Sequence, residues 1–204
     1  MAIAGNIGSG KSSLTRLLSD RYGLRPVYEA VDENPYLEDF YASMELYGFH
    51  SQIFFLARRL QQHVEQVNPG EHVVQDRTVY EDAAIFATNL HRQGIMSDRD
   101  YRSYWQLYEA VRSTLKEPDL LVYLRAGLPK LRQQIALRGR EYETSIEDAY
   151  LLQLNSLYEE WIAGYDQSRL LVLEADDLDY VHRQEDRDHV FDLLERSGLP
   201  GPLL

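Results

Sequence analysis

The chain has 204 residues, of which 44% are hydrophobic and 26% charged, an ordinary balance for one globular domain that excludes intrinsic disorder as its main state. Twenty-one basic against 33 acidic residues give a net charge of −12, the wrong sign for a protein whose whole surface attracts nucleic acid or anionic lipid. There is no cysteine, so disulfide scaffolds and thiolate metal sites are excluded too.

Short apolar runs typical of strands alternate along the chain with longer segments of helical period. The predicted strands are Met1–Ala4, Pro26–Glu29, His72–Gln75, Leu120–Leu124 and Leu170–Leu173. The predicted helices are Lys11–Arg21, Leu37 to about Val67 with a break near Gly48, Tyr80–Gln93, Asp98–Lys116, Leu128–Leu137, Ile146–Gly164 and Arg183–Ser197. We therefore expect residues 1–204 to form one α/β domain: a five-stranded, doubly wound parallel sheet flanked by helices, with ligands beyond the carboxyl ends of its strands.

A glycine-rich loop follows the first predicted strand. Gly5–Ser12 satisfies the phosphate-loop pattern G-x-x-x-x-G-K-[ST] at every fixed position. Glycines let the backbone N–H groups point at phosphate oxygens, while Lys11 can reach the β- and γ-phosphates and Ser12 can hold Mg²⁺. The strand before the loop and the amphipathic helix after it argue against a chance match. The predicted ATP-binding residues here are Gly5, Asn6, Ile7, Gly8, Ser9, Gly10, Lys11, Ser12 and Ser13.

The rest of the sequence narrows the reaction class. It contains no Asn-Lys-x-Asp to read guanine and no long apolar strand ending in Asp-Glu, which disfavours a GTPase and a mechanical ATPase. The class of protein that remains is a kinase of small molecules.

Acidic and basic residues at the ends of two predicted strands are candidates for the acceptor side. Glu29 ends the second strand, where a carboxylate can orient and deprotonate the attacking hydroxyl; it also fits a solvated acidic loop equally well. The third strand leads into Asp76, a candidate Mg²⁺ ligand, and Arg77, a candidate for binding the acceptor's 5′ oxygen or a phosphate. Asp82 reads, by position alone, as an ordinary carboxylate in the first turn of a helix.

Gln52 and Arg59 lie seven residues apart in a segment of helical period, which places them on one helix face about 10.5 Å apart. Tyr41 would share that face if the helix continued through Gly48. The Gln52 amide offers a donor and an acceptor side by side, suited to the edge of a nucleobase. Spacing alone, however, favours Gln52 and Arg59 as surface residues of an amphipathic helix.

Arg138 and Arg140 flank a glycine at the end of a predicted helix. Such a pair suits a mobile lid, here about residues 138–146, that carries positive charge to the transferring phosphoryl group; a solvated basic helix end is the alternative. In so acidic a chain, a phosphate site needs its own cluster of positive groups. We expect Lys11, Arg77 and the two lid arginines to form that cluster.

Taken together, these segments resemble the deoxynucleoside kinase family, in particular its bacterial deoxyadenosine/deoxycytidine kinase branch. The stretches that carry the resemblance are Gly5–Ser12, Glu29 with Val31-Asp32 and Asn34-Pro35-Tyr36-Leu37, Phe49-His50-Ser51-Gln52 through Arg59, Gln75–Asp82, Arg138–Glu143 and Trp161. They span nearly the whole chain. The sequence departs from the family pattern at Ala30, where many relatives have proline, and at Thr78, where serine is usual; neither change removes a functional group.

The resemblance implies roles at the matching positions of the acceptor site. Gln52 would pair with the edge of the base, and Arg59 and Asp82 would form an ionic pair that frames it. Tyr41 and Glu143 would hold the 3′-hydroxyl, and Tyr41 would also crowd the 2′ position and so disfavour ribose.

The resemblance implies the catalytic groups as well. Glu29 would be the base that acts on the 5′-hydroxyl, with Arg77 beside it, and Arg138 and Arg140 would form the lid. The donor would be ATP with Mg²⁺, held at Ser12 and Asp76. The loop around Asp176 and Asp177 would surround the donor adenine. Inhibition by a deoxynucleotide end product and a homodimer are also implied.

Base preference follows from the same comparison. Having both Arg59 and Asp82 is unlike the thymidine-preferring members and favours a purine or cytosine, but the Gln52 amide can flip to suit adenine, cytosine or guanine. The Gln75–Asp82 stretch looks closer to deoxyadenosine kinases than to bacterial deoxyguanosine kinases. We therefore expect a kinase that transfers the ATP γ-phosphate to the 5′-hydroxyl of deoxyadenosine in nucleotide salvage. Deoxyguanosine or deoxycytidine as main substrate stays open.

Two other functions are compatible with a phosphate loop. A nucleoside monophosphate kinase would need further arginines facing its charged acceptor. A catalytically idle module that binds ATP to control a partner would have no need of Glu29, Arg77 and the lid arginines.

The sequence also bears on location. Apolar runs such as Leu120–Leu124 fall far short of the roughly 18 residues of a membrane span, and residues 1–8 lack the basic start and apolar core of a secretory signal. We expect a cytoplasmic enzyme that contacts neither nucleic acid nor membrane. The first predicted strand begins at residue 1, which leaves room for residues missing before Met1.

Overall fold

The computed structural model describes residues 1–29, 33–70 and 72–199; Ala30, Val31 and Asp32, named above, lie outside the described residues. Within these ranges, five parallel strands form one sheet in the order β2-β3-β1-β4-β5. The strands are β1 Ala2–Gly5, β2 Arg25–Val27, β3 Val73–Asp76, β4 Leu120–Arg125 and β5 Arg169–Glu174. The predicted five-stranded parallel sheet is confirmed.

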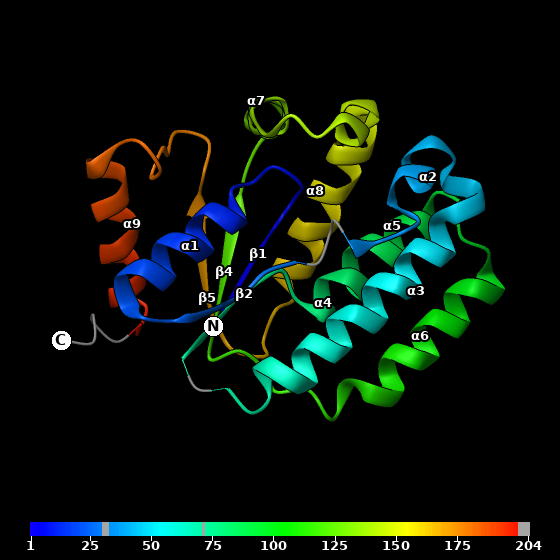
Figure 1. Ribbon diagram of the computed structural model, residues 1–204, viewed down its shortest axis with the longest axis horizontal. Coiled ribbons are helices and arrows are strands. Elements are labelled where there is room, and N and C mark those ends of the chain that lie inside the picture. Colours follow the sequence, from blue (N-terminus) through cyan, green and yellow to red (C-terminus); the bar gives the residue numbers. More distant parts are fainter. Residues whose placement is uncertain (30–32, 71, 200–204) are drawn as a thin grey trace.

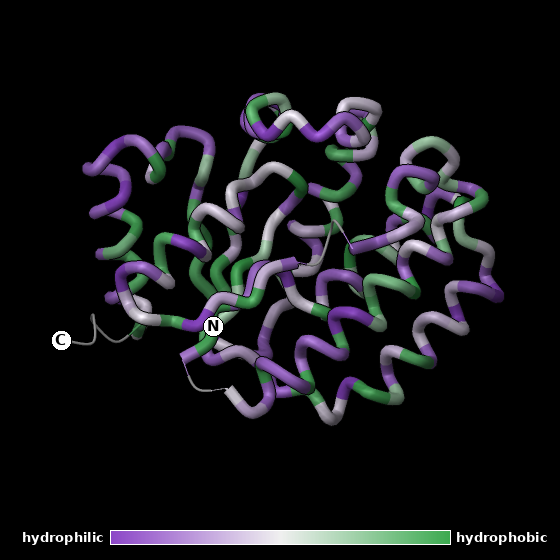
Figure 2. The backbone as a smooth tube through the Cα atoms, in the orientation of Figure 1, coloured by the Kyte–Doolittle hydropathy of each residue, from purple (hydrophilic) through white to green (hydrophobic). Residues whose placement is uncertain are grey.

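The sheet separates two hydrophobic cores because successive side chains of a strand point to opposite faces. Ala2 and Ala4 of β1 pack into one core and Ile3 into the other. The core with Ile3 is covered by α1 (Lys11–Tyr22) and α9 (Gln184–Arg196), and the opposite face by α8 (Asp148–Ala163) and the helices between β2 and β4 (Figure 1). The strands are mostly green in Figure 2, and purple residues recur along the outer helices, as a doubly wound sheet requires.

Most of the remaining helices lie between β2 and β4. Those between β2 and β4 are α2 Leu37–Ala42, α3 Met44–Gln62, the π-helix η2 His63–Val67, α4 Val79–Glu81, the π-helix η3 Asp82–Ala87, α5 Thr88–Arg92 and α6 Asp98–Arg112. Between β4 and α8 lie α7 Leu128–Arg138 and the 3₁₀ turn η4 Glu141–Ser145. In the described part of the chain, no helix combines the length and the hydrophobicity that a membrane crossing needs.

The predicted helix break near Gly48 is wrong. The chain breaks at Ser43, whose φ of −153° and ψ of 82° separate α2 from α3. Gly48 lies inside α3, where an added Cβ would be 3.4 Å from the side chains of Leu90 and Ile95. The glycine therefore serves close packing and does not end a helix. Tyr41 consequently lies on a different helix from Gln52, contrary to the shared helix face considered above.

The second strand is shorter than predicted. β2 pairs with β3 only at Arg25, Pro26 and Val27, so Glu29 lies two residues beyond the strand and does not end it. The predicted Tyr80–Gln93 helix is divided into α4, η3 and α5, and the helix predicted over Asp98–Lys116 ends at Arg112. These differences leave the order of elements unchanged.

Candidate active site

The glycine-rich loop connects β1 directly to α1, as predicted. Gly5, Gly8 and Gly10 have φ angles of 150°, 82° and 101°, a backbone region that side chains with a Cβ rarely adopt. A Cβ at Gly10 would also collide with the hydroxyl of Tyr180. The loop ends at the N-terminus of α1, whose free N–H groups and helix dipole favour a phosphate.

Lys11 is buried and turned back onto its own loop. Its Nζ donates hydrogen bonds of 2.9 Å to the carbonyl oxygens of Gly5 and Asn6. Burial lowers the pKa of Lys11 to about 7, and the charge of Arg77 acts in the same direction. The ammonium group is therefore poorly compensated where it lies, and a nearby phosphate would stabilise its charge.

Ser12 and Asp76 meet beneath the loop. The Ser12 hydroxyl donates to Asp76 Oδ2 at 2.5 Å, and Asp76 Oδ1 is buried without a hydrogen-bond partner in the described structure. The described residues hold no group of three or more metal-ligating side chains. Kinase Mg²⁺ sites commonly use only one or two protein oxygens together with substrate phosphates, and this pair fits that pattern.

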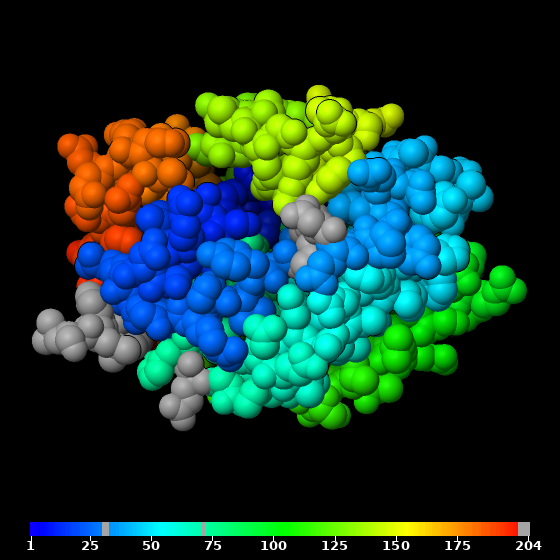
Figure 3. Space-filling view, viewed as in Figure 1, coloured from blue at the N-terminus to red at the C-terminus, as the bar shows by residue number. Residues whose placement is uncertain are grey.

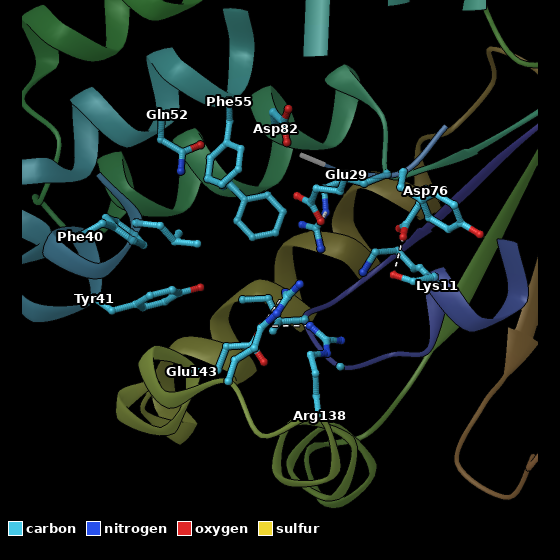
Figure 4. Close-up of a pocket in the computed structure, with 18 of the residues that line it drawn as sticks. Lys11, Glu29, Phe40, Tyr41, Gln52, Phe55, Asp76, Asp82, Arg138 and Glu143 are labelled. Atoms are coloured by element: carbon cyan, nitrogen blue, oxygen red, sulfur yellow. Dashed lines mark hydrogen bonds and ion pairs between the residues drawn. The ribbon is translucent and has the colours of Figure 1, made fainter. Parts of the chain in front are cut away.

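A pocket of about 450 Å³ opens beyond the carboxyl ends of β1 and β3, and Figure 3 shows the hollow between the phosphate loop, α2 and the segment that follows α7. Its polar lining residues include Lys11, Ser12, Glu29, Tyr41, Gln52, Asp76, Arg77, Asp82, Arg138, Arg140 and Glu143. In Figure 4, Tyr41 and Gln52 lie on one side, Lys11 and Asp76 on the other, and Glu29 between them. The expected cluster of four positive side chains is confirmed at this pocket.

Glu29 bridges two buried arginines. Its Oε1 accepts a 2.9 Å hydrogen bond from Arg59 Nη2, and its Oε2 lies 3.2 Å from Arg77 Nε. Burial alone would raise the pKa of Glu29, but the charges of Arg77, Arg59 and Lys11 hold it at about 2. Arg77 has a left-handed φ of 66°, and its guanidinium lies 4.3 Å from the centre of the Phe86 ring. The carboxylate is thus ionised and fixed in place.

Gln52 and Arg59 face inward, so their interpretation as surface residues is wrong. Each is 3% exposed. Arg59 donates two hydrogen bonds to Asp82, from Nε to Oδ2 at 2.7 Å and from Nη2 to Oδ1 at 3.3 Å. Asp82 is therefore a buried, paired carboxylate and not an ordinary carboxylate in the first turn of a helix. Gln52 Oε1 is buried without a partner in the described structure, and its side chain lines the pocket. It is therefore an acceptor available to a ligand.

Tyr41 and Glu143 reach the pocket from α2 and η4. The Tyr41 ring stacks on Tyr142, with centroids 5.9 Å apart and planes 11° apart. Glu143 Oε1 accepts hydrogen bonds from Arg138 at 2.9 Å and Arg140 at 3.4 Å, whereas its Oε2 is buried with no hydrogen-bond partner in the described structure. Arg138, at the end of α7, and Arg140 are therefore bonded to a carboxylate whose second oxygen is available to a ligand.

Asp176 and Asp177 do not line this pocket. Both are exposed, and Asp176 Oδ1 accepts a 2.7 Å hydrogen bond from the N–H of Gly127, just before α7. Their role at the donor adenine stays a prediction.

A buried polar layer under the phosphate loop was missed from the sequence. Glu81 Oε1 accepts hydrogen bonds from the Gly5 N–H at 3.2 Å and from Tyr158 at 2.9 Å, and its Oε2 accepts from the Thr78 N–H at 2.8 Å. Asn6 Nδ2 donates to Asn155 Oδ1 at 2.7 Å. Asn155 and Tyr158 are three residues apart among the leucines of α8, and that polar pair in an apolar helix is the signal that could have found them.

A phosphate loop on the central strand of a parallel sheet, beside a pocket with a fixed carboxylate and four cations, defines a P-loop kinase. Comparison with known proteins shows to which family of P-loop kinases the chain belongs. The model of the deoxynucleoside kinase family matches residues 1–197. The chain belongs to the deoxynucleoside kinase family, as its resemblance implied.

The relatives agree in sequence and in structure. The chain is 38% identical over 194 residues to a deoxyadenosine/deoxycytidine kinase of Bacillus subtilis, covering 94% of this chain and 89% of the relative. It is 35% identical over 202 residues to a deoxyguanosine kinase of Lactobacillus acidophilus, covering 94% and 87%. The structure of deoxyadenosine kinase from M. mycoides with bound dATP superimposes with a TM-score of 0.84 at 30% identity, covering 95% of this chain and 98% of that one.

Proposed function

We propose that this kinase transfers the ATP γ-phosphate to the 5′-hydroxyl of purine deoxynucleosides in nucleotide salvage, with deoxyadenosine as its main substrate. The observation that carries the proposal is the position of Glu29, which is held between Arg59 and Arg77 in the pocket that also contains Lys11. Such a carboxylate has the acceptor site on one side and the donor phosphates on the other.

In the proposed reaction, the 5′ oxygen attacks the γ-phosphorus and its proton passes to Glu29. The bond from the γ-phosphorus to the bridging oxygen breaks, and ADP leaves with the electron pair. Lys11, Arg77 and the two lid arginines neutralise the charge on the phosphoryl oxygens. Because the pKa of Glu29 is about 2, the carboxylate is a weak base that accepts the proton late in the transfer, which suits a loose transition state.

The acceptor side of the pocket suits an uncharged deoxynucleoside. The rings of Phe55 and Phe86 line the pocket together with Gln52, so a flat base has aromatic surfaces beside it and an amide at its edge. The free oxygen of Glu143 is an acceptor for a 3′-hydroxyl. The relatives include a deoxyadenosine/deoxycytidine kinase at 38% identity and a deoxyguanosine kinase at 35%. The higher identity to the first of these supports deoxyadenosine as the main substrate.

A coupled assay of ADP release tests this function. The protein is supplied with ATP and Mg²⁺ and, in turn, with deoxyadenosine, deoxyguanosine, deoxycytidine, thymidine and adenosine. We expect the largest kcat/KM with deoxyadenosine and little turnover of adenosine. No ADP release with any of the five nucleosides, followed by ADP release with a nucleoside monophosphate, would contradict the proposal and favour a nucleoside monophosphate kinase.

We propose that Tyr41 is the filter against ribose. Tyr41→Ala removes the side chain that would crowd a 2′-hydroxyl, so the ratio of kcat/KM for deoxyadenosine over adenosine is expected to fall about tenfold, the effect of roughly 1.4 kcal/mol. Steady-state kinetics with both nucleosides measure this ratio. Tyr36→Ala is the control, because Tyr36 lies near α2 but does not line the pocket. An unchanged ratio in Tyr41→Ala would remove Tyr41 from sugar selection.

We propose that Ser12 and Asp76 hold the Mg²⁺ that accompanies ATP, because Asp76 has a buried oxygen with no other partner among the described residues. Bound Mg²⁺ neutralises phosphate charge during the transfer. Asp76→Asn removes a charged ligand, so the Mg²⁺ concentration for half-maximal rate should rise about tenfold or more at saturating ATP. Asp20→Asn, at an exposed position on α1, should behave as wild type. An equal Mg²⁺ requirement in both variants would exclude Asp76 as a ligand.

We also propose that the protein is a cytoplasmic homodimer, that residues 1–204 form a single domain with a lid at about 138–146, and that a deoxynucleotide end product inhibits it. Family membership supports these points. Leu46 of α3 and Leu107 of α6 are 68% and 43% exposed, apolar positions that a second copy would cover.

A further inference from the structure

The Gly5 carbonyl oxygen, at the start of the phosphate loop, receives two donors. Lys11 Nζ lies 2.9 Å from it, and the hydroxyl of Tyr158 lies 2.8 Å from it. Gly5 and Tyr158 are buried, and Tyr158 is 0% exposed. A buried backbone carbonyl needs at least one donor, because leaving it without one carries the full cost of its lost hydration.

The Tyr158 hydroxyl, in turn, has two acceptors. Glu81 Oε1 lies 2.9 Å from it, and the Gly5 carbonyl oxygen lies 2.8 Å from it. A phenol has a single hydrogen to donate, so it can serve only one of these acceptors at a time. Burial raises the pKa of Tyr158 well above its usual value, so the hydroxyl keeps that hydrogen.

Glu81 does not depend on Tyr158 for its partners. Its Oε1 also accepts from the Gly5 N–H at 3.2 Å, and its Oε2 accepts from the N–H and the hydroxyl of Thr78 at 2.8 Å and 3.1 Å. Lys11 and Arg77 add positive charge nearby. The carboxylate therefore keeps hydrogen bonds when the phenol turns away, whereas the side-chain donors to the Gly5 carbonyl in the described part of the chain are Lys11 and Tyr158.

Nucleotide binding removes one of the two side-chain donors to the Gly5 carbonyl, because it moves Lys11. In the structure the ammonium group rests on the Gly5 and Asn6 carbonyls, but the lysine of a phosphate loop contacts the β- and γ-phosphates when nucleotide is bound. Once Nζ turns to the phosphates, the Gly5 carbonyl loses it as a donor. The phenol is then the one described side chain within reach that can replace it.

We propose that Tyr158 is a positioning residue for nucleotide binding: its hydroxyl turns from Glu81 to the Gly5 carbonyl as Lys11 leaves for the phosphates. Lys11 can thereby move to the phosphates without leaving the buried Gly5 carbonyl without a hydrogen-bond donor. The proposal rests on the role of Lys11 in the proposed function, and Tyr158 acts through Lys11 and Gly5 without touching the nucleotide.

The test is Tyr158→Phe, which keeps the ring and removes the hydroxyl. In this variant Lys11 is the remaining donor to the Gly5 carbonyl and is held back, so the Kd for ATP, measured with a fluorescent ATP analogue, and the KM for ATP should rise about tenfold. The KM for deoxyadenosine should not change. Tyr123→Phe is the matched control: Tyr123 is buried and stacks on Tyr158 with centroids 5.5 Å apart, but its hydroxyl donates to Glu159.

A double-mutant cycle separates this role from a structural one. If Tyr158 acts through Lys11, Tyr158→Phe should leave the weakened ATP affinity of Lys11→Met unchanged. An ATP affinity equal to that of Tyr123→Phe, or an equal further loss in the Lys11→Met background, would overturn the proposal. ATP binding is measured without a nucleoside, so these results stand whichever nucleoside the five-substrate assay identifies.

Discussion

Replacing Glu29 by glutamine should lower kcat with deoxyadenosine by about 10²–10⁴-fold, the range that a positioned general base contributes. The amide cannot take the 5′-hydroxyl proton. Its oxygen can still accept from one of the two arginines that hold Glu29, so the pocket and ATP binding should be preserved. Single-turnover transfer measured by quench, together with titration of a fluorescent ATP analogue, separates the two effects.

Glu33→Gln is a matched control, because Glu33 pairs with Arg58 at the surface and does not line the pocket. It should retain wild-type turnover. Full activity of Glu29→Gln would remove Glu29 from the mechanism, and loss of ATP binding in that variant would show that the carboxylate mainly maintains the arginines.

The pH dependence of Glu29 has a definite sign. Its pKa in the folded protein is about 2, below the ordinary 4.5, so its contribution to stability is full above about pH 4.5 and is lost as the pH falls toward 2. Between about pH 5 and pH 8 the carboxylate stays ionised. An acid limb of the rate profile in that interval must therefore belong to another group, and Glu29→Gln should lose less stability than wild type on acidification below pH 4.5.

Replacing Arg59 by alanine should change base preference and stability together. Arg59 is 3% exposed and bonded to both Asp82 and Glu29. Its removal leaves Asp82 buried without its cation, which costs about 3–5 kcal/mol in comparable buried pairs. We expect kcat/KM for deoxyadenosine to fall about 10²-fold, with a smaller loss for thymidine and little change in ATP affinity. Chemical denaturation and kinetics with each nucleoside measure both effects.

A double variant without the Arg59–Asp82 charges separates the effect on base preference from the effect on stability. Arg59→Met combined with Asp82→Asn leaves no buried charge unpaired, so most of the lost stability should return. The altered base preference should remain if the ion pair frames the base. Equal losses of kcat/KM for every base in this double variant would argue against the framing role.

The phosphate loop and the sheet could be predicted because their signals are local. Gly5–Ser12 carries its pattern within eight positions, and each strand is a short apolar run next to a helix of clear period. Glu29 was identified from the same local order, although the strand ends two residues earlier, because β2 has a partner along Arg25–Val27 alone.

Burial of polar side chains could not be predicted in this way. Helical period places Gln52 and Arg59 on one face but does not say whether that face meets water or a pocket; only Asp82 and Glu29, from distant parts of the chain, decide it. The Tyr158 contact with Gly5 spans 153 positions. No local pattern encodes such a pairing, and the family resemblance supplied roles only where it had motifs.

The central place of β1 in the sheet has a consequence for how the protein is made. β1 pairs with β3 through Ala2 and Gln75 and with β4 through Ala2 and Leu121. Because β3 and β4 are synthesised after β1, this strand cannot pair until they have been made. Pairing across such separations is slow and leaves apolar strands exposed meanwhile. Because Tyr158 of α8 also bonds to the Gly5 carbonyl of the phosphate loop, the nucleotide site is complete only after α8 has been synthesised.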